Sequence, residues 1–104
     1  NVAHGSDEYE DVVRALGDDL VDLAARAGLT TYDVGRNDLA ATFHPGGPDR
    51  MLLDYVFAPA SFEALEVRAL LDAPLEEVAN CPPGYARRPF SSDHFGVGVT
   101  LRVP

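Results

Sequence analysis

The stretch SSDHFGVGVTLRV, residues 91–103, carries the strongest structural signal in this sequence. Apolar residues occupy every second position from Phe95 to Val103, and small or polar residues stand between them. Strict alternation with a period of two is typical of a β-strand that buries one face. The polar residues Asp93 and His94 stand directly before this strand. The pattern therefore predicts a strand over residues 95–103 with an Asp-His pair at its start.

A second apolar stretch, MLLDYVFA at residues 51–58, follows a turn rich in Pro and Gly at residues 45–50. Its β-branched and aromatic residues predict a buried strand, which Asp54 interrupts. A carboxylate in such a strand is costly without a partner, and a histidine is the obvious candidate. An Asp that accepts from one ring nitrogen fixes the tautomer of the imidazole. An Asp-His pair such as Asp93-His94 also occurs at ordinary strand-end turns, so a catalytic and a purely structural interpretation both stay open at this point.

The remaining elements follow from periodicity and capping residues. Ser6 caps a helix whose apolar stripe runs from Tyr9 to Leu16, and Gly17 ends it. The other predicted elements are a helix over residues 20–27 capped by Asp18 or Asp19 and ended by Gly28, a loop at 29–38, a strand at 40–44, a strand at 62–72 that also partly fits a helix, and a long loop at 73–91. The chain is thus predicted to be α/β, with two N-terminal helices followed by mostly antiparallel strands.

Length and charge limit the classes of function. The chain has 104 residues, with 8 basic and 17 acidic side chains and a net charge of −9. Such acidity argues against a general nucleic-acid binder and against attachment to anionic membranes. Cys81 is the one cysteine, so no intrachain disulfide forms, and we interpret it as a structural free thiol. No apolar run reaches the roughly 20 residues that span a bilayer, so no membrane span is expected.

Three motifs resemble one known family. Residues 92–97, SDHFGV, before an alternating strand, resemble the Ser-Asp-His motif that closes the endonuclease/exonuclease/phosphatase family, which has the DNase I-like fold. Residues 53–57, LDYVF, resemble the family's Leu-Asp-Tyr-Ile-Phe strand. Asn1, followed by a helix capped by Ser6, resembles the last residue of the family's Gly-Asp-x-Asn motif. The resemblance implies that residues 1–104 are the C-terminal half of one two-sheet α/β sandwich, whose N-terminal half lies outside this sequence.

The resemblance also implies a role for each matching residue. His94 would contact the scissile phosphate and stabilise its developing charge, and Asp54 would orient His94. The resemblance therefore implies that the Asp54 and His94 side chains meet at about 2.6–3.2 Å. Asp93 would be a second acid of the site, on the metal side, and Asn1 would bond a phosphate oxygen or the attacking water. The family uses Mg²⁺, or Mn²⁺, which suits carboxylate and water ligands. Separately, the adjacent Arg87 and Arg88 are candidates to bind a substrate phosphate, with a solvated loop pair as the alternative.

The expected function is that of a metal-dependent phosphoesterase, active when the domain is complete. It would hydrolyse a phosphodiester or phosphomonoester by attack of a metal-activated water. The substrate class stays open among nucleic acid, a phospholipid headgroup, an inositol phosphate and other small phosphoesters. We expect residues 1–104 alone to be inactive, to expose apolar surface and to bind the missing half of the domain. The alternative is a catalytically incomplete or inactive family member that acts as an interaction module. The sequence does not assign a cellular compartment.

Overall fold

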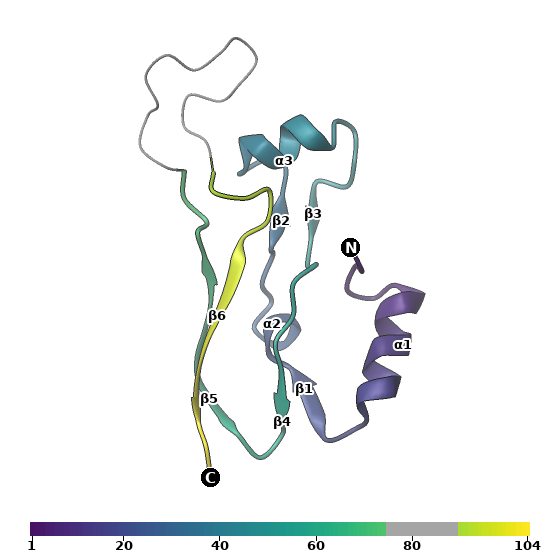
Figure 1. Cartoon of the computed structure of the whole chain (residues 1–104), viewed down its shortest axis with the longest axis vertical. Coiled ribbons are helices and arrows are strands. Elements are labelled where there is room, and N and C mark those ends of the chain that lie inside the picture. Colours follow the sequence, from purple (N-terminus) through teal and green to yellow (C-terminus); the bar gives the residue numbers. More distant parts are fainter. Residues whose placement is uncertain (75–89) are drawn as a thin grey trace.

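A computed structural model describes residues 1–74 and 90–104 of the chain. Their elements, in order, are α1 (Asp7–Leu16), β1 (Leu20–Asp22), α2 (Leu23–Arg26), β2 (Tyr32–Asp33), α3 (Asp38–Phe43), β3 (Arg50–Met51), β4 (Phe57–Pro59), β5 (Glu63–Leu70) and β6 (Gly96–Arg102). The strands pair antiparallel as β1 with β4, β2 with β3, and β5 with β6 (Figure 1). The prediction of a mixed α/β chain with antiparallel strands is therefore confirmed.

The first helix lies where its capping residue and periodicity place it. The Ser6 hydroxyl accepts the backbone N–H of Tyr9 at 3.2 Å, and Gly17 follows the helix with φ 86°. Tyr9 is buried, and its hydroxyl donates to the Asp22 carboxylate at 2.8 Å. This contact fixes α1 against the segment that leads into α2.

The prediction of a second helix over residues 20–27 is wrong for its first three residues. Leu20 lies in β1, which pairs with β4, and only the single turn of α2 is helical. The cap is Asp22, whose carboxylate accepts the backbone N–H of Ala25 at 3.1 Å, and not Asp18 or Asp19. Pairing with a strand distant in sequence overrides local helix periodicity here. The predicted end is confirmed, because Gly28 has φ 67° and Gly28 and Leu29 donate to the last carbonyls of α2.

Two further predictions along the chain are corrected. The expected strand at residues 40–44 lies largely within helix α3, and the expected loop at 29–38 contains β2. The Asn37 side chain explains the helix, because its Oδ1 accepts the N–H groups of Leu39 and Ala40 at 3.0 and 3.2 Å. Asn is among the best N-cap residues, and this cap starts a helix that apolar alternation alone does not indicate.

The buried strand predicted over residues 51–58 is interrupted. Met51 ends β3 and Phe57 begins β4, whereas residues 52–56 belong to no strand. Ala58 is buried, but residues 51–57 are half-buried. This irregular segment contains Asp54.

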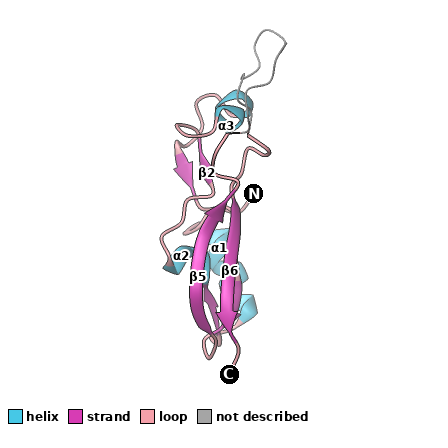
Figure 2. Cartoon of the chain, turned by 90° about the vertical axis from the view of Figure 1, so that its left-hand side faces the viewer, coloured by secondary structure: helices cyan, strands magenta, loops and turns pink. Residues whose placement is uncertain are grey.

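The long antiparallel pair of β5 and β6 confirms the strands predicted at residues 62–72 and 95–103. Val67 pairs with Val99, Ala69 with Val97, and Glu63 with Arg102. The apolar residues share the face that is turned toward α2, while Glu63 and Arg102 form an ion pair on exposed side chains. Figure 2 shows the pair at the outside of the molecule with α1 and α2 behind it.

The core of the described residues is small and draws its apolar side chains from α1, α2, β2, α3, β4 and the segment before β6. Its fully buried side chains include Tyr32, Phe95, Asn37, Thr31 and Asp33. Several of these are polar, and each polar atom has a hydrogen-bond partner. Within the described ranges, no helix is long and apolar enough to cross a membrane.

Candidate functional site

His94 and Asp54 form a side-chain pair. His94 Nδ1 lies 2.8 Å from Asp54 Oδ2, which confirms the distance expected from the sequence. The side chain of His94 is 19% exposed and that of Asp54 is 40% exposed, so water reaches the pair from one side. A carboxylate in this position accepts the Nδ1 proton and leaves Nε2 available for another partner.

Asn1 lies beside the other nitrogen of the His94 ring. Its side-chain Nδ2 is 3.5 Å from His94 Nε2. An amide NH₂ group only donates, so this contact requires a lone pair on Nε2, which is the tautomer that Asp54 favours. The two contacts on the ring are therefore consistent with each other. A ligand oxygen placed beside them could accept from both groups, once Nε2 carries a proton.

Tyr55 holds the N-terminal segment that carries Asn1. Its hydroxyl lies 2.5 Å from the carbonyl oxygen of Val2 and 2.8 Å from that of Leu52. The backbone N–H of His4 donates to the same Leu52 carbonyl at 3.0 Å. Burial raises the pKa of Tyr55, and the nearby carboxylates of Asp22 and Asp54 raise it further, so its phenol stays a hydrogen-bond donor.

The loop that presents His94 is held by three side-chain contacts. Ser92 Oγ accepts the backbone N–H of His94 at 3.1 Å, and the Asn37 amide donates to the Ser92 carbonyl at 2.8 Å. The ring of Tyr32 meets the His94 ring edge-on, with centroids 5.7 Å apart. Because Asn37 and Tyr32 are buried, they fix the ring of His94 from the core side.

Asp93 is half-buried, and it makes no hydrogen bond to His94 or Asp54 among the contacts of the described residues. Its Oδ1 lies 3.4 Å from Ser92 Oγ. Burial and, secondly, the negative charge of Asp93 raise the pKa of Tyr32, which places this carboxylate near the Tyr32 phenol. Residues 1–74 and 90–104 contain no group of three His, Cys, Asp or Glu side chains arranged to hold a metal ion. One carboxylate is nonetheless compatible with Mg²⁺, which is commonly bound by one or two carboxylates together with water and substrate phosphate.

Arg87, Arg88 and Cys81 lie outside the described residues, so their predicted roles are not placed by the structure. Two other arginines near the site have structural partners. Arg36 lies over the ring of Phe95 and pairs with Asp72, and Arg50 pairs with the buried Asp33 at 2.9 Å.

An apolar cavity of about 160 Å³ adjoins Asn1. Its walls include Tyr32, His44, Met51 and Leu53. His44 is exposed and forms part of this wall. A group attached to a ligand held at Asn1 would have an apolar surface to contact here.

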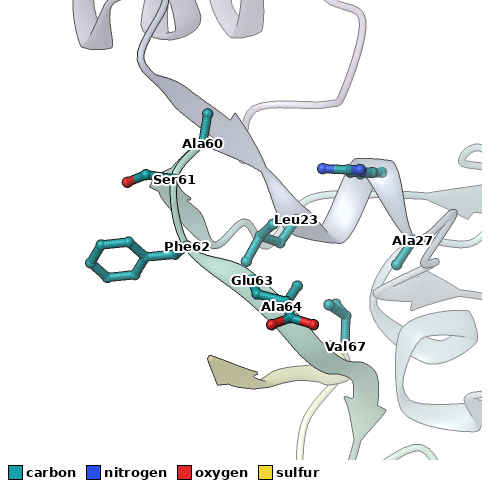
Figure 3. Close-up of a pocket in the computed structure, with 9 residues that line it drawn as sticks. Leu23, Ala27, Ala60, Ser61, Phe62, Glu63, Ala64 and Val67 are labelled. Carbon is teal, nitrogen blue, oxygen red and sulfur yellow. The ribbon is translucent and has the colours of Figure 1, made fainter. Parts of the chain in front are cut away.

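A second, more open cavity of about 480 Å³ lies elsewhere, between α2 and β5 (Figure 3). Leu23, Ala27, Ala64 and Val67 line it, and none of the residues around His94 does. It marks incomplete cover of the apolar face of β5, not the candidate site.

Sequence reasoning missed Asn37, Tyr32 and Tyr55 as parts of the site. Of these, Asn37 had a readable signal, because Asn followed by Asp38 and apolar residues is a helix start. The contacts of the others join residues distant in sequence, which no local pattern reports. Comparisons with protein-family models, with curated proteins and with solved structures found no match to this chain.

Proposed function

We propose that this chain is the C-terminal part of a metal-dependent phosphoesterase domain of the endonuclease/exonuclease/phosphatase kind. The observation that carries the proposal is the ordered row of Asp54, His94 and Asn1, with contacts of 2.8 Å and 3.5 Å on the two nitrogens of one ring. One residue of this row comes from each of the three motifs quoted from the sequence, which supports the proposal.

The chemistry suits transfer of a phosphoryl group to water. With Nδ1–H held by Asp54, a second proton on Nε2 makes His94 a cationic donor aimed at the space beside Asn1. Hydrolysis of a phosphodiester places extra negative charge on the phosphate oxygens as water adds and the alcohol leaves. Donors fixed in advance at those oxygens stabilise the transition state more than the ground state. Asn1 adds a neutral donor to the same oxygen or to the attacking water.

Asp93 is the residue that we propose to hold Mg²⁺ or Mn²⁺, together with residues of the other half of the domain. When bound, the ion supplies positive charge at the phosphate and a more acidic water. The contact of Asp93 with Ser92 leaves further carboxylate lone pairs for such an interaction.

The exposed apolar surface supports the proposal that a second half of the domain packs here. The pair of β5 and β6 is two-stranded, and two strands alone are marginally stable in water. Leu65 is 49% exposed, and the cavity between α2 and β5 leaves Val67 partly uncovered. We propose that the complementary half of the sandwich covers this face.

The test is hydrolysis by the full-length protein that contains this chain. The probes are bis(p-nitrophenyl) phosphate, p-nitrophenyl phosphate, a single-stranded oligonucleotide, sphingomyelin vesicles and an inositol phosphate, each with Mg²⁺, with Mn²⁺ and with EDTA. We expect turnover of at least one probe that EDTA abolishes and His94→Ala strongly reduces. No turnover by the folded, metal-loaded protein on any probe would favour the interaction module instead.

A further inference from the structure

Thr31, the residue before β2, is fully buried and bonds to three separate parts of the site. Its Oγ1 accepts the backbone N–H of Leu53 at 2.9 Å and that of Asp54 at 3.2 Å. Its carbonyl accepts the N–H of Phe95 at 2.6 Å, and its own N–H donates to the carbonyl of Met51 at 3.1 Å. One residue therefore contacts the backbone of Asp54 and the backbone that follows His94.

These bonds replace the strand pairing that the Asp54 segment lacks. Residues 52–56 belong to no strand, yet half-buried N–H groups need acceptors. A hydroxyl oxygen has two lone pairs, and the N–H groups of Leu53 and Asp54 use both. Valine has nearly the same shape as threonine and no lone pair, so Thr31→Val would leave two N–H groups without these acceptors.

We propose that Thr31 is a positioning residue for the Asp54–His94 pair. Its hydroxyl sets the backbone of Asp54 and its carbonyl sets that of Phe95, so the carboxylate and the ring meet at 2.8 Å. A displacement of about 1 Å at such a site can lower the rate about 10²-fold. This consequence for catalysis rests on the proposed function, whereas the consequence for the geometry of the pair does not.

The experiment reads the tautomer of His94 directly. Long-range ¹H–¹⁵N NMR correlations of the full-length, ¹⁵N-labelled protein distinguish Nδ1–H from Nε2–H rings, and His94→Gln assigns the signal. Spectra are recorded at about pH 8.5, well above the ordinary histidine pKa of about 6.5, so that free rings are neutral. The series is wild type, Thr31→Val, Thr31→Ser and the matched control Thr30→Val. Amide hydrogen exchange of Leu53 and Asp54 is measured on the same samples.

The expected result separates the two threonines. In Thr31→Val the tautomer of the His94 ring shifts from Nδ1–H toward the mixture shown by an unstructured histidine peptide. The backbone amides of Leu53 and Asp54 exchange at least tenfold faster. The kcat falls about 10²-fold with little change in KM. Thr31→Ser, which keeps the oxygen, and Thr30→Val behave as wild type. If Thr31→Val does not fold, Thr31→Ser decides, because a wild-type tautomer supports the proposal and a lost one overturns it.

A folded Thr31→Val protein with wild-type tautomer and amide exchange would overturn the positioning role. That outcome is distinct from failure of the proposed function, in which the wild-type protein turns over no phosphoester while the NMR result still decides the role of Thr31.

Discussion

Asp54→Asn is the sharpest perturbation of the candidate site, because it keeps the shape of the side chain and removes its charge. The carboxylate oxygen lies 2.8 Å from His94 Nδ1. An Asn at this position can still accept one hydrogen bond, but it supplies no negative charge to favour a protonated ring. It can also turn its NH₂ group toward the ring and favour the opposite tautomer.

The size of the effect follows from the exposure of the two groups. A hydrogen bond to a charged group contributes about 1.5–3 kcal/mol. Asp54 is 40% exposed and His94 is 19% exposed, so water screens the pair and the lower end of that range applies. A loss of about 1.5 kcal/mol in the transition state lowers kcat about tenfold.

His94→Ala removes the donor itself and is expected to be more severe. Loss of one donor aimed at developing charge typically lowers kcat about 10² to 10³-fold. On the proposed function, KM should change much less, because the interaction would strengthen as the phosphate reacts. The double variant should be no slower than His94→Ala, because Asp54 acts on catalysis through the ring alone.

The assay is steady-state turnover of a cleaved phosphoester by the full-length protein, with thermal unfolding of each variant measured in parallel. Asp49→Asn, at an exposed carboxylate in the turn before β3, is the matched control and should have wild-type kinetics. A stability change of 1 kcal/mol would shift Tm by about 2–4 °C in a domain of about 150–250 residues, so larger shifts would signal a structural change beyond the site. A folded His94→Ala enzyme with near-normal kcat, or fully additive effects in the double variant, would refute the reasoning.

Three further predictions follow from the contacts around the site. Tyr55→Phe should lower kcat about tenfold and the free energy of unfolding by about 1 kcal/mol, because the carbonyl of Val2 loses its hydrogen bond and Asn1 is held less firmly. Steady-state kinetics and thermal unfolding measure the two effects, and an unchanged kcat would contradict the prediction. Asp33→Ala should cost about 3 kcal/mol in urea unfolding, because the buried carboxylate accepts from three N–H groups, including that of Arg50; a cost below 1 kcal/mol would argue against this. The free energy of unfolding should fall as pH rises above about 10. Burial and, secondly, the hydrogen bond to Asp22 raise the pKa of Tyr9 in the folded state. The neutral phenol therefore stabilises the fold at pH values below the unfolded-state pKa of about 10, and this contribution is lost as pH rises further. Tyr9→Phe should flatten that slope in unfolding measured from pH 8 to 11, and an unchanged slope would assign the effect to other groups.

The long regular elements were determined by the sequence itself. Helix α1 and strand β6 follow from their hydrophobic periods, because each element buries one face and exposes the other. The period of residues 62–72 fits a strand and, in part, a helix, and pairing with β6 decides for the strand β5. The meeting of Asp54 and His94 was also predicted, through the motifs around the two residues, while burial alone indicated only that Asp54 requires a partner.

The short elements and the support of the site were decided by tertiary structure. Leu20 lies in a strand because it pairs with β4, which follows the irregular residues 52–56, and not because the residues next to Leu20 favour an extended backbone. The Asp54 segment leaves the strand geometry because Thr31, 22 residues before Leu53, provides acceptors that a pairing strand would otherwise provide. Contacts between residues this far apart in the sequence depend on where the folded chain places its backbone N–H groups, and the local hydrophobic periodicity does not indicate these positions.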